Sequence, residues 1–227
     1  MAAEPLSNGA THLSVPGRYI LPVHKRPSSS VNGKWALPVV DLGGDDDGTI
    51  AEEIVRAGRE FGFFQVVNHG VPEEVMGAMM RAAEEFFALP ADEKMKYYSN
   101  DGKKLPRFHT SLRNGTGEEV LYWRDCLKLG CHLPEWPDKP RGLGAALEPY
   151  TAAVRAAARR VLRLAAVGLG LEEEHFEGSL SGGGMMNELV LAAGEGPLYK
   201  PYSYGEFLAV YVAEGGVREA VMAHLKH

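Results

Sequence analysis

A succession of short apolar strands and amphipathic helices in the first half of this chain constrains its fold more than any other feature. The run LPVVDL at residues 37–42 predicts a strand that ends at a glycine pair. Thr49 and Glu52 have the spacing of a capping box at the start of a helix, and Gly62 ends that helix. FFQVV at residues 63–67 predicts a buried strand. This order predicts a helix-rich α+β chain.

The same pattern continues beyond the second strand. Asn68, His69 and Gly70 predict a tight turn, and Pro72 suits the first turn of the next helix because its missing N–H costs nothing there. Apolar residues then recur at helical spacing, and a shorter helical turn is predicted over residues 91–97. The apolar stripe of the longer helix comprises Val75, Met79, Ala83 and Phe86.

Two longer segments complete the predicted core. Residues 107–133 change to a period of two, which is typical of a half-buried strand. The longest helix is predicted over residues 147–167, with an apolar face that packs onto the strands. Its opposite face carries a row of arginines that we interpret as solvated, because the chain is acidic and no aromatic residues interleave. These are Arg155, Arg159 and Arg163.

Composition excludes several classes of protein. The net charge of −6 argues against a general nucleic-acid binder, and no apolar run approaches the length of a membrane span. The acidic run at residues 45–47 is interpreted as a solvated loop. Two cysteines, Cys126 and Cys131, lie on opposite faces of a predicted strand, so the pattern favours a reducing cytoplasmic or nuclear setting. The N-terminus lacks the pattern of a secretory signal.

Glycine-rich residues 178–184 predict a flexible segment. They do not fit a phosphate-binding loop, because Met185, Met186 and Asn187 follow where a lysine and a hydroxyl residue would be required. Beyond them, residues 203–211 and 217–225 predict two short helices, the first with a capping box at Ser203 and Glu206.

Several of these segments, in this order, resemble the plant-type 2-oxoglutarate- and Fe(II)-dependent dioxygenases that act on small specialised metabolites. The run FGFFQVVNHGV at residues 61–71 is the most specific, and FFALPADEK at 86–94 is similar to the helix end that follows it. EEV at 118–120 with YWRD at 122–125 resembles the flavanone 3-hydroxylase-like, hyoscyamine 6-hydroxylase-like and salicylate-hydroxylating branch. PLYKPYSYGEFL at 197–208 resembles the C-terminal helix entry.

The resemblance implies Fe(II), 2-oxoglutarate and ascorbate as cofactors and a small-molecule substrate. It places four residues on strands near the substrate pocket of an intact member, namely Phe108, Thr110, Tyr122 and Arg124. A plain strand role is equally open for them, because aromatic residues are common in strands. In this family the Asn-His-Gly turn at residues 68–70 is structural, so His69 is not expected to bind iron.

The iron-binding motif of the family is missing from the chain. None of the eight histidines is followed two positions later by an aspartate, although such an oxygenase holds iron with two histidines and a carboxylate. His175 and Glu177 form a His-x-Glu pair, but it precedes the position of the catalytic jelly roll. Forty residues follow Asn187, whereas an eight-stranded roll needs roughly 80 to 100. The sequence therefore predicts that most of the double-stranded β-helix is absent.

These observations predict an extended or disordered arm at residues 1–34 and a dioxygenase N-terminal region at 35–140. A long helix and linker at 141–187 and a helical tail at 188–227 would follow. Three functions stay open: a shortened dioxygenase without catalysis, an interaction protein that pairs with a full-length relative, and an active enzyme with unconventional iron ligands. No catalytic, cofactor-binding or metal-binding residue is predicted.

Overall fold

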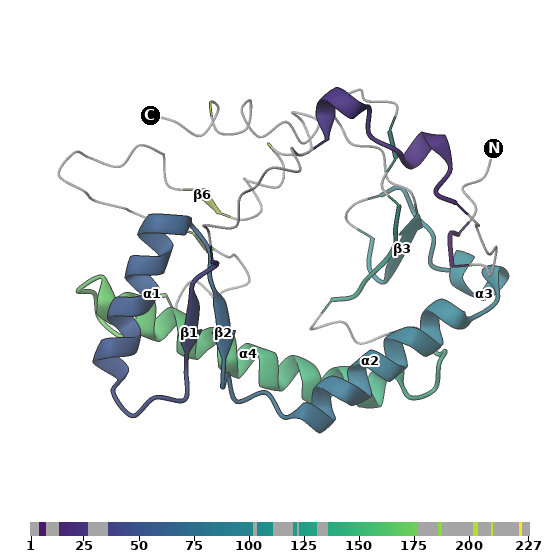
Figure 1. The fold of residues 1–227 in the computed structure, drawn as a ribbon. Coiled ribbons are helices and arrows are strands. Elements are labelled where there is room, and N and C mark those ends of the chain that lie inside the picture. Colours follow the sequence, from purple (N-terminus) through teal and green to yellow (C-terminus); the bar gives the residue numbers. More distant parts are fainter. Residues whose placement is uncertain are drawn as a thin grey trace. The chain divides into compact units, whose positions relative to one another are not determined.

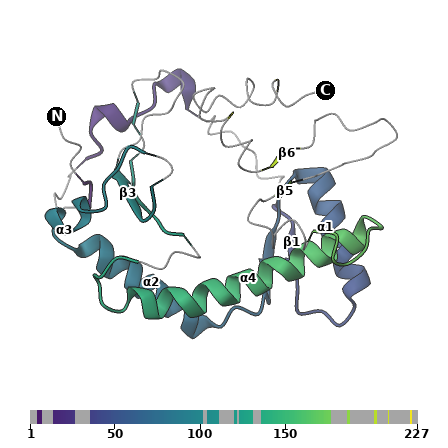
Figure 2. The ribbon, with the colours of Figure 1, turned by 180° about the vertical axis from the view of Figure 1, so that it is seen from behind.

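The computed structural model describes residues 5–7, 14–26, 36–101, 104–110, 120–121, 123–130, 136–176, 186–187 and 202–203, with residues 210 and 223. Figures 1 and 2 show its elements from two sides. The 3-10 turns are Gly17–Tyr19 and Val23–Lys25. The helices are α1 (Asp47–Phe61), α2 (Glu73–Ala88), α3 (Ala91–Met95) and α4 (Leu143–Gly168). The strands are β1 (Val39–Asp41), β2 (Gln65–Val67), β3 (Arg107–Thr110), β4 (Asp125–Lys128), β5 (Met186–Asn187) and β6 (Tyr202–Ser203).

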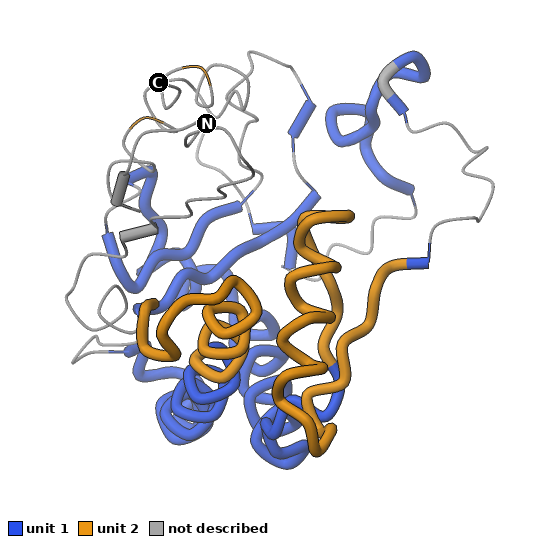
Figure 3. Tube along the Cα trace, turned by 90° about the vertical axis from the view of Figure 1, so that its left-hand side faces the viewer, with its two compact units in different colours: residues 1–36, 67–113, 119–158 blue, residues 37–66, 114–118, 159–227 orange. Residues whose placement is uncertain are grey.

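The predicted helix-rich α+β class is confirmed, and each sheet formed by the described residues has two strands. The chain divides into two compact units, coloured in Figure 3. Unit 1 comprises residues 1–36, 67–113 and 119–158, and unit 2 comprises residues 37–66, 114–118 and 159–227. The predicted boundaries near residues 34, 140 and 187 follow family segments, and they stay predictions.

Unit 2 is built around the β1–β2 sheet, α1 and the second half of α4. The alternation in β1 directs Val40 inward and leaves Val39 and Asp41 exposed. One apolar cluster joins these elements, and its burial supplies the main stabilising term of the unit. Its buried members are Val40, Leu42, Ile50, Ala51, Ile54 and Leu164, with Phe64, Val66, Val161 and Ala165 packed against them.

Helix α1 begins three residues earlier than the capping-box pattern predicts, because its N-cap is Asp46 and not Thr49. Asp46 is its N-cap: the carboxylate accepts a hydrogen bond from the Gly48 amide, and the Thr49 hydroxyl donates to the same side chain. An aspartate is as good an N-cap as a threonine, so the upstream residue takes the role. The helix ends as predicted at Gly62, whose φ of 76° is accessible to glycine without strain.

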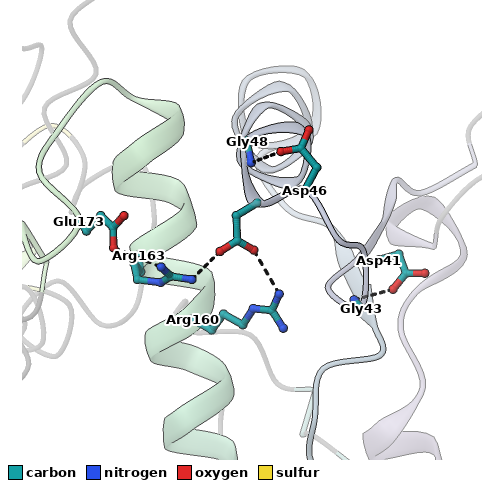
Figure 4. A network of polar contacts seen from close by, with 8 residues as sticks. Asp41, Gly43, Asp46, Gly48, Arg160, Arg163 and Glu173 are labelled. Atoms are coloured by element: carbon teal, nitrogen blue, oxygen red, sulfur yellow. Dashed lines mark hydrogen bonds and ion pairs between the residues drawn. The ribbon is translucent and has the colours of Figure 1, made fainter.

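Asp47 also departs from the predicted solvated loop. Its two carboxylate oxygens pair with Arg160 at 3.3 Å and Arg163 at 2.7 Å, and Arg163 also reaches Glu173 at 3.1 Å (Figure 4). The hydrogen bond from Arg163, with a further bond from Arg160, lowers the pKa of Asp47 although desolvation opposes the shift. The side chain of Arg163 is still 39% exposed, so it stays at the surface, but it pairs there with an acid that lies far away in the sequence.

A close approach between α1 and α4 depends on a glycine. A Cβ at Gly168 would lie 2.5 Å from the Ala51 carbonyl oxygen and 2.7 Å from a methyl group of Val55. No larger residue fits without moving backbone. The helix ends there, and Gly170 follows in the left-handed region with a φ of 73°.

Strand β2 is shorter and more exposed than predicted. It spans Gln65–Val67, with Gln65 and Val67 exposed and Val66 half-buried. Phe63 lies before the strand and is 58% exposed. The prediction of a buried strand is wrong here, since a two-stranded sheet has one face packed on α1 and α4 and a second face that the described residues leave open.

Unit 1 packs α2, α3 and the start of α4 against the β3–β4 hairpin. Phe86 and Phe108 are fully buried, with ring centroids 6.3 Å apart. The predicted stripe of α2 is partly shifted, because Ala82 and Phe86 are its buried positions while Met79 is half-buried. Helix α4 begins at Leu143, one turn before the predicted start, and continues through Pro149. The predicted helices at 203–211 and 217–225 lie almost wholly outside the described residues.

Candidate functional site

The β3–β4 hairpin carries most of the polar side chains that are buried in the described chain. The strands are antiparallel, and Arg107 faces Lys128, Phe108 faces Leu127, His109 faces Cys126 and Thr110 faces Asp125. Opposite residues share a face, and faces alternate along each strand. The hairpin therefore has an inner face of Phe108, Thr110, Asp125 and Leu127, and an outer face of Arg107, His109, Cys126 and Lys128.

The inner face belongs to the core of unit 1. Phe108 is buried against Phe86, and Leu127 packs beside it. Thr110 is 4% exposed and its side chain hydrogen-bonds to Asp125. The inner face thus combines an apolar half with a polar end.

That polar end is closed by the N-terminus of the chain. The amides of Leu6 and Ser7 donate to the Asp125 carboxylate at 3.1 and 2.8 Å, and the Ser7 hydroxyl donates to it at 2.6 Å. The Lys94 ammonium in α3 donates to the Ser7 hydroxyl oxygen at 2.7 Å, to the Ser7 carbonyl at 3.2 Å and to the Phe87 carbonyl at 2.7 Å. We call Leu6 and Ser7 the strap, since they bridge a buried lysine and a carboxylate.

The hydrogen bonds of the strap explain how the Lys94 ammonium and the Asp125 carboxylate are tolerated away from water. Lys94 has no exposed surface, and its burial lowers the pKa of the ammonium although the Asp125 carboxylate opposes the shift. Burial alone would raise the pKa of Asp125, but hydrogen bonds from Ser7, Thr110 and the Leu6 amide outweigh it and the pKa lies below its ordinary value. A buried lysine is tolerated where acceptors are supplied, and Ser7 supplies two of the three.

The outer face holds two buried polar side chains with unpartnered atoms. Arg107 is 5% exposed and His109 is 3% exposed. Within the described part of the chain, Arg107 Nε and His109 Nδ1 have no hydrogen-bond partner. Burial, followed by the positive charges of Arg107, Lys128 and Arg124, lowers the pKa of His109 to about 4. His109 is therefore a neutral imidazole at neutral pH, surrounded by cations.

Of the four residues predicted near the substrate pocket, the three that the structure describes separate between the two faces. Phe108 and Thr110 lie on the inner face. Arg124 is exposed and lies two residues before Cys126, which places it beside the outer face. Tyr122 lies outside the described residues. The pocket assignment of all four stays a prediction.

Sequence reasoning missed Arg107 and His109 as candidate residues. The alternation of the strand could have indicated them, because they share a face with Lys128 and occupy the positions between the predicted ones. What it could not indicate is that they are buried, since the sequence gives no measure of burial for a polar residue in a strand.

The described residues do not fit an iron centre of the dioxygenase type. Across the described residues, no group of three or more His, Cys, Asp or Glu side chains could hold a metal ion. His69 Nδ1 accepts a hydrogen bond from the Val71 amide at 3.1 Å, so the imidazole serves the turn, where Asn68 has a φ of 51°. His175 packs edge-on against Phe176, with ring centroids 5.1 Å apart, in a hydrogen-bonded turn.

A hollow of about 480 Å³ lies on unit 2. Its lining mixes opposite charges, carries no histidine or hydroxyl, and gives no arrangement suited to metal or acid–base chemistry. The lining residues are Glu52, Val55, Arg56, Arg59, Glu60 and Gly168. No described helix is both long enough and apolar enough to cross a membrane.

Known proteins with similar sequences match the part of the chain that contains helices α1 to α3 and the β1–β2 and β3–β4 sheets. A family model described as non-haem dioxygenase in morphine synthesis, N-terminal, matches residues 37–150. The chain is 40% identical over 182 residues to 2'-deoxymugineic-acid 2'-dioxygenase of Hordeum vulgare, covering 77% of this chain and 52% of the relative. It is 37% identical over 191 residues to flavanone 3-dioxygenase 2 of Oryza sativa subsp. japonica, covering 79% and 56%.

Hyoscyamine 6-dioxygenase of Hyoscyamus niger is 35% identical over 190 residues, with 78% and 55% covered. The chain thus spans about half the length of the curated relatives it matches. The solved structure of JOX2 in complex with 2OG, Fe and JA aligns with a TM-score of 0.60 and 33% identity, over 77% of this chain and 51% of that one. The chain belongs to the non-haem, 2-oxoglutarate- and Fe(II)-dependent dioxygenases, of which it holds the N-terminal region.

Proposed function

We propose that this chain, as it stands, is a non-catalytic form of a dioxygenase that hydroxylates or desaturates a small specialised metabolite. The observation that carries the proposal is the sequence itself: no His-x-Asp occurs in its 227 residues. Iron of this class needs two imidazoles and a carboxylate that converge. The fold described around α1, α2 and α4 contains the supporting elements of such an enzyme and no such triad among the described residues.

The relatives support the substrate class only in general terms. One is named for 2'-deoxymugineic acid, one for flavanone and one for hyoscyamine. We propose a flavonoid, phenolic or alkaloid type of substrate for an intact relative of this chain. Fe(II), 2-oxoglutarate and ascorbate are the cofactors of that family, and the proposal has none of them bound here. A cytoplasmic location belongs to the same proposal, and so does the absence of nucleic-acid partners, which the net charge of −6 supports.

The decisive measurement is iron-dependent turnover of 2-oxoglutarate by the purified chain. Thermal stability is compared with 2-oxoglutarate alone and with 2-oxoglutarate plus Fe(II) under argon, and succinate is measured after oxygen and ascorbate are admitted. The proposal expects no additional shift on adding iron and no succinate. Stoichiometric iron binding, or succinate above the protein-free control, contradicts it.

A second candidate function is an interaction protein that pairs with a full-length relative. The exposed side of the β1–β2 sheet in unit 2 favours it, because three large apolar side chains lie open there. Leu37 is 43% exposed, Val39 is 54% exposed and Phe63 is 58% exposed. A two-stranded sheet also has unpaired edges, which are templates for a strand from another chain.

A pull-down with a purified full-length relative separates the two candidates. Val39→Asp should abolish capture if the sheet is the interface, whereas Val23→Asp should leave it intact, because Val23 is also apolar and is 77% exposed in another part of the chain. Equal loss with both variants, or no capture by the wild-type chain, rejects the interaction candidate.

A further inference from the structure

The outer face of the β3–β4 hairpin gathers positive charge in an acidic chain. Arg107 faces Lys128 across the two strands, and Arg124 lies two residues before Cys126 on the same side. His109 lies between them. We propose that this face binds the carboxylate group of a small organic acid, with Arg107 and His109 as the buried partners and Lys128 and Arg124 at the entrance.

Arg107 is the strongest argument for an anion. A guanidinium taken out of water loses several kcal/mol of hydration unless an opposite charge and hydrogen bonds replace it. Arg107 is 5% exposed, its Nε atom lacks a partner, and no ion pair between described residues includes it. A bound carboxylate would supply both the charge and the acceptor, and the planar guanidinium fork matches its geometry.

His109 supplies a second unpartnered atom on the same face. The imidazole is neutral, so one of its two nitrogens carries a proton and can donate to an anion. Its Nδ1 atom is buried and lacks a partner within the described chain. Arg107 Nε and His109 Nδ1 are thus two buried, unpartnered nitrogens on one face, as many as a carboxylate has oxygens. A sulfate or phosphate would bring four oxygens into the same place, and the buried partners are too few for them.

Lys128 and Arg124 are the solvent-exposed cations of the outer face. Both are exposed, whereas Arg107 and His109 are buried. Exposed cations at the rim of a buried site attract an anion and raise its rate of association, and their effect falls with added salt. The inference rests on the proposed function in one respect. It takes the β3–β4 hairpin to be the part of a dioxygenase that lies near the substrate, present here in a chain without the iron centre.

The test is calorimetric titration of the full chain with benzoate at neutral pH, without iron or 2-oxoglutarate. Benzamide serves as the uncharged isostere and sulfate as the inorganic anion. Benzoate should bind at least tenfold more tightly than either. Lys128→Gln should weaken benzoate binding about threefold, as for an exposed ion pair. Arg107→Gln should weaken it at least tenfold, as for a buried charge-assisted bond.

Lys104→Gln is the control, because it removes an equal charge from an exposed position in the same unit. It should bind benzoate like the wild type. Since Arg107→Gln could unfold the hairpin, its circular dichroism is recorded, and the Lys128→Gln result decides the matter if folding is lost. A ¹⁵N shift of the His109 ring on adding benzoate would locate the ligand at this face.

Three results of the comparisons among ligands and variants would overturn the inference. They are equal binding of benzamide, sulfate binding as tight as benzoate, and an equal loss in Lys104→Gln. Absence of benzoate binding would overturn it as well and would leave the proposed non-catalytic function untouched. Succinate release in the iron assay would overturn the proposed function alone, so the two failures are distinguishable.

Discussion

At the scale of single residues, His109 combines burial with a positively charged neighbourhood. Its pKa falls from 6.5 to about 4 on folding, so between those pH values the unfolded chain binds a proton that the folded chain does not. Stability is therefore fully present above pH 6.5 and is lost as the pH falls toward 4. The loss is at most about 3 kcal/mol, at 1.36 kcal/mol for each unit of pKa.

The measurement is urea unfolding at several pH values from 7 to 4. His109→Gln should remove most of the slope in the upper part of that window, because Asp47 and Asp125, whose pKa values are lowered, add to the slope only as the pH approaches 4. His24→Gln removes an exposed imidazole and should leave the slope in place. A slope that is the same in wild type and His109→Gln would show that other groups produce it.

Gly168 is the second residue whose role is set by its surroundings. Gly168→Ala places a methyl group against the Ala51 carbonyl, which must move, so unfolding free energy should fall by about 2 kcal/mol or more. Gly58→Ala provides the matched control in α1, because nothing lies within 4 Å of its Cβ position. It should stabilise the chain by up to about 1 kcal/mol through helix propensity. Chemical denaturation of both variants checks the opposite signs.

At the scale of elements, the strap couples the N-terminus to α3 and β4. Ser7→Ala removes one acceptor of Lys94 and one donor to Asp125, and it should cost about 2 kcal/mol, as for hydrogen bonds to charged groups. Ser14→Ala, an exposed position in the same arm, should cost nothing measurable. Hydrogen exchange should show faster opening at β4 in Ser7→Ala only. Unchanged exchange there would mean that the strap does not hold the hairpin.

The elements themselves were predictable where their signals are local. Gly62 ends α1 as predicted, and the turn at Asn68–Gly70 uses positive φ at both ends. Asp46 and Thr49 are both suitable N-cap residues, and the sequence alone did not distinguish them. In the structure Asp46 is the N-cap of α1. Helix α4 begins at Leu143, one turn before the predicted start, and passes through Pro149, and its first turn is held by Leu143 and Ala146, which are buried in the core of unit 1.

At the scale of the whole molecule, the described residues form two separate apolar clusters. One contains Ile54 and Leu164, and the other contains Phe86 and Phe108. Ile54→Val and Phe86→Leu should each cost about 1 kcal/mol. The first should lower amide protection in β1 and α1, and the second in the β3–β4 hairpin. Equal loss of protection everywhere in both variants would show that the clusters unfold as one cooperative unit.

The sequence alone determined the family, the order of strands and helices, and the absence of a His-x-Asp. These depend on residues within a few positions of each other, where periodicity, turn chemistry and motif spacing act. Only the tertiary structure decided that Lys94 is buried against Ser7, that Asp47 binds Arg163, and that Arg107 and His109 are buried on the outer face. The physical reason is distance along the chain: Ser7 meets Asp125 across 118 positions, and no local pattern encodes which polar groups such a contact removes from water.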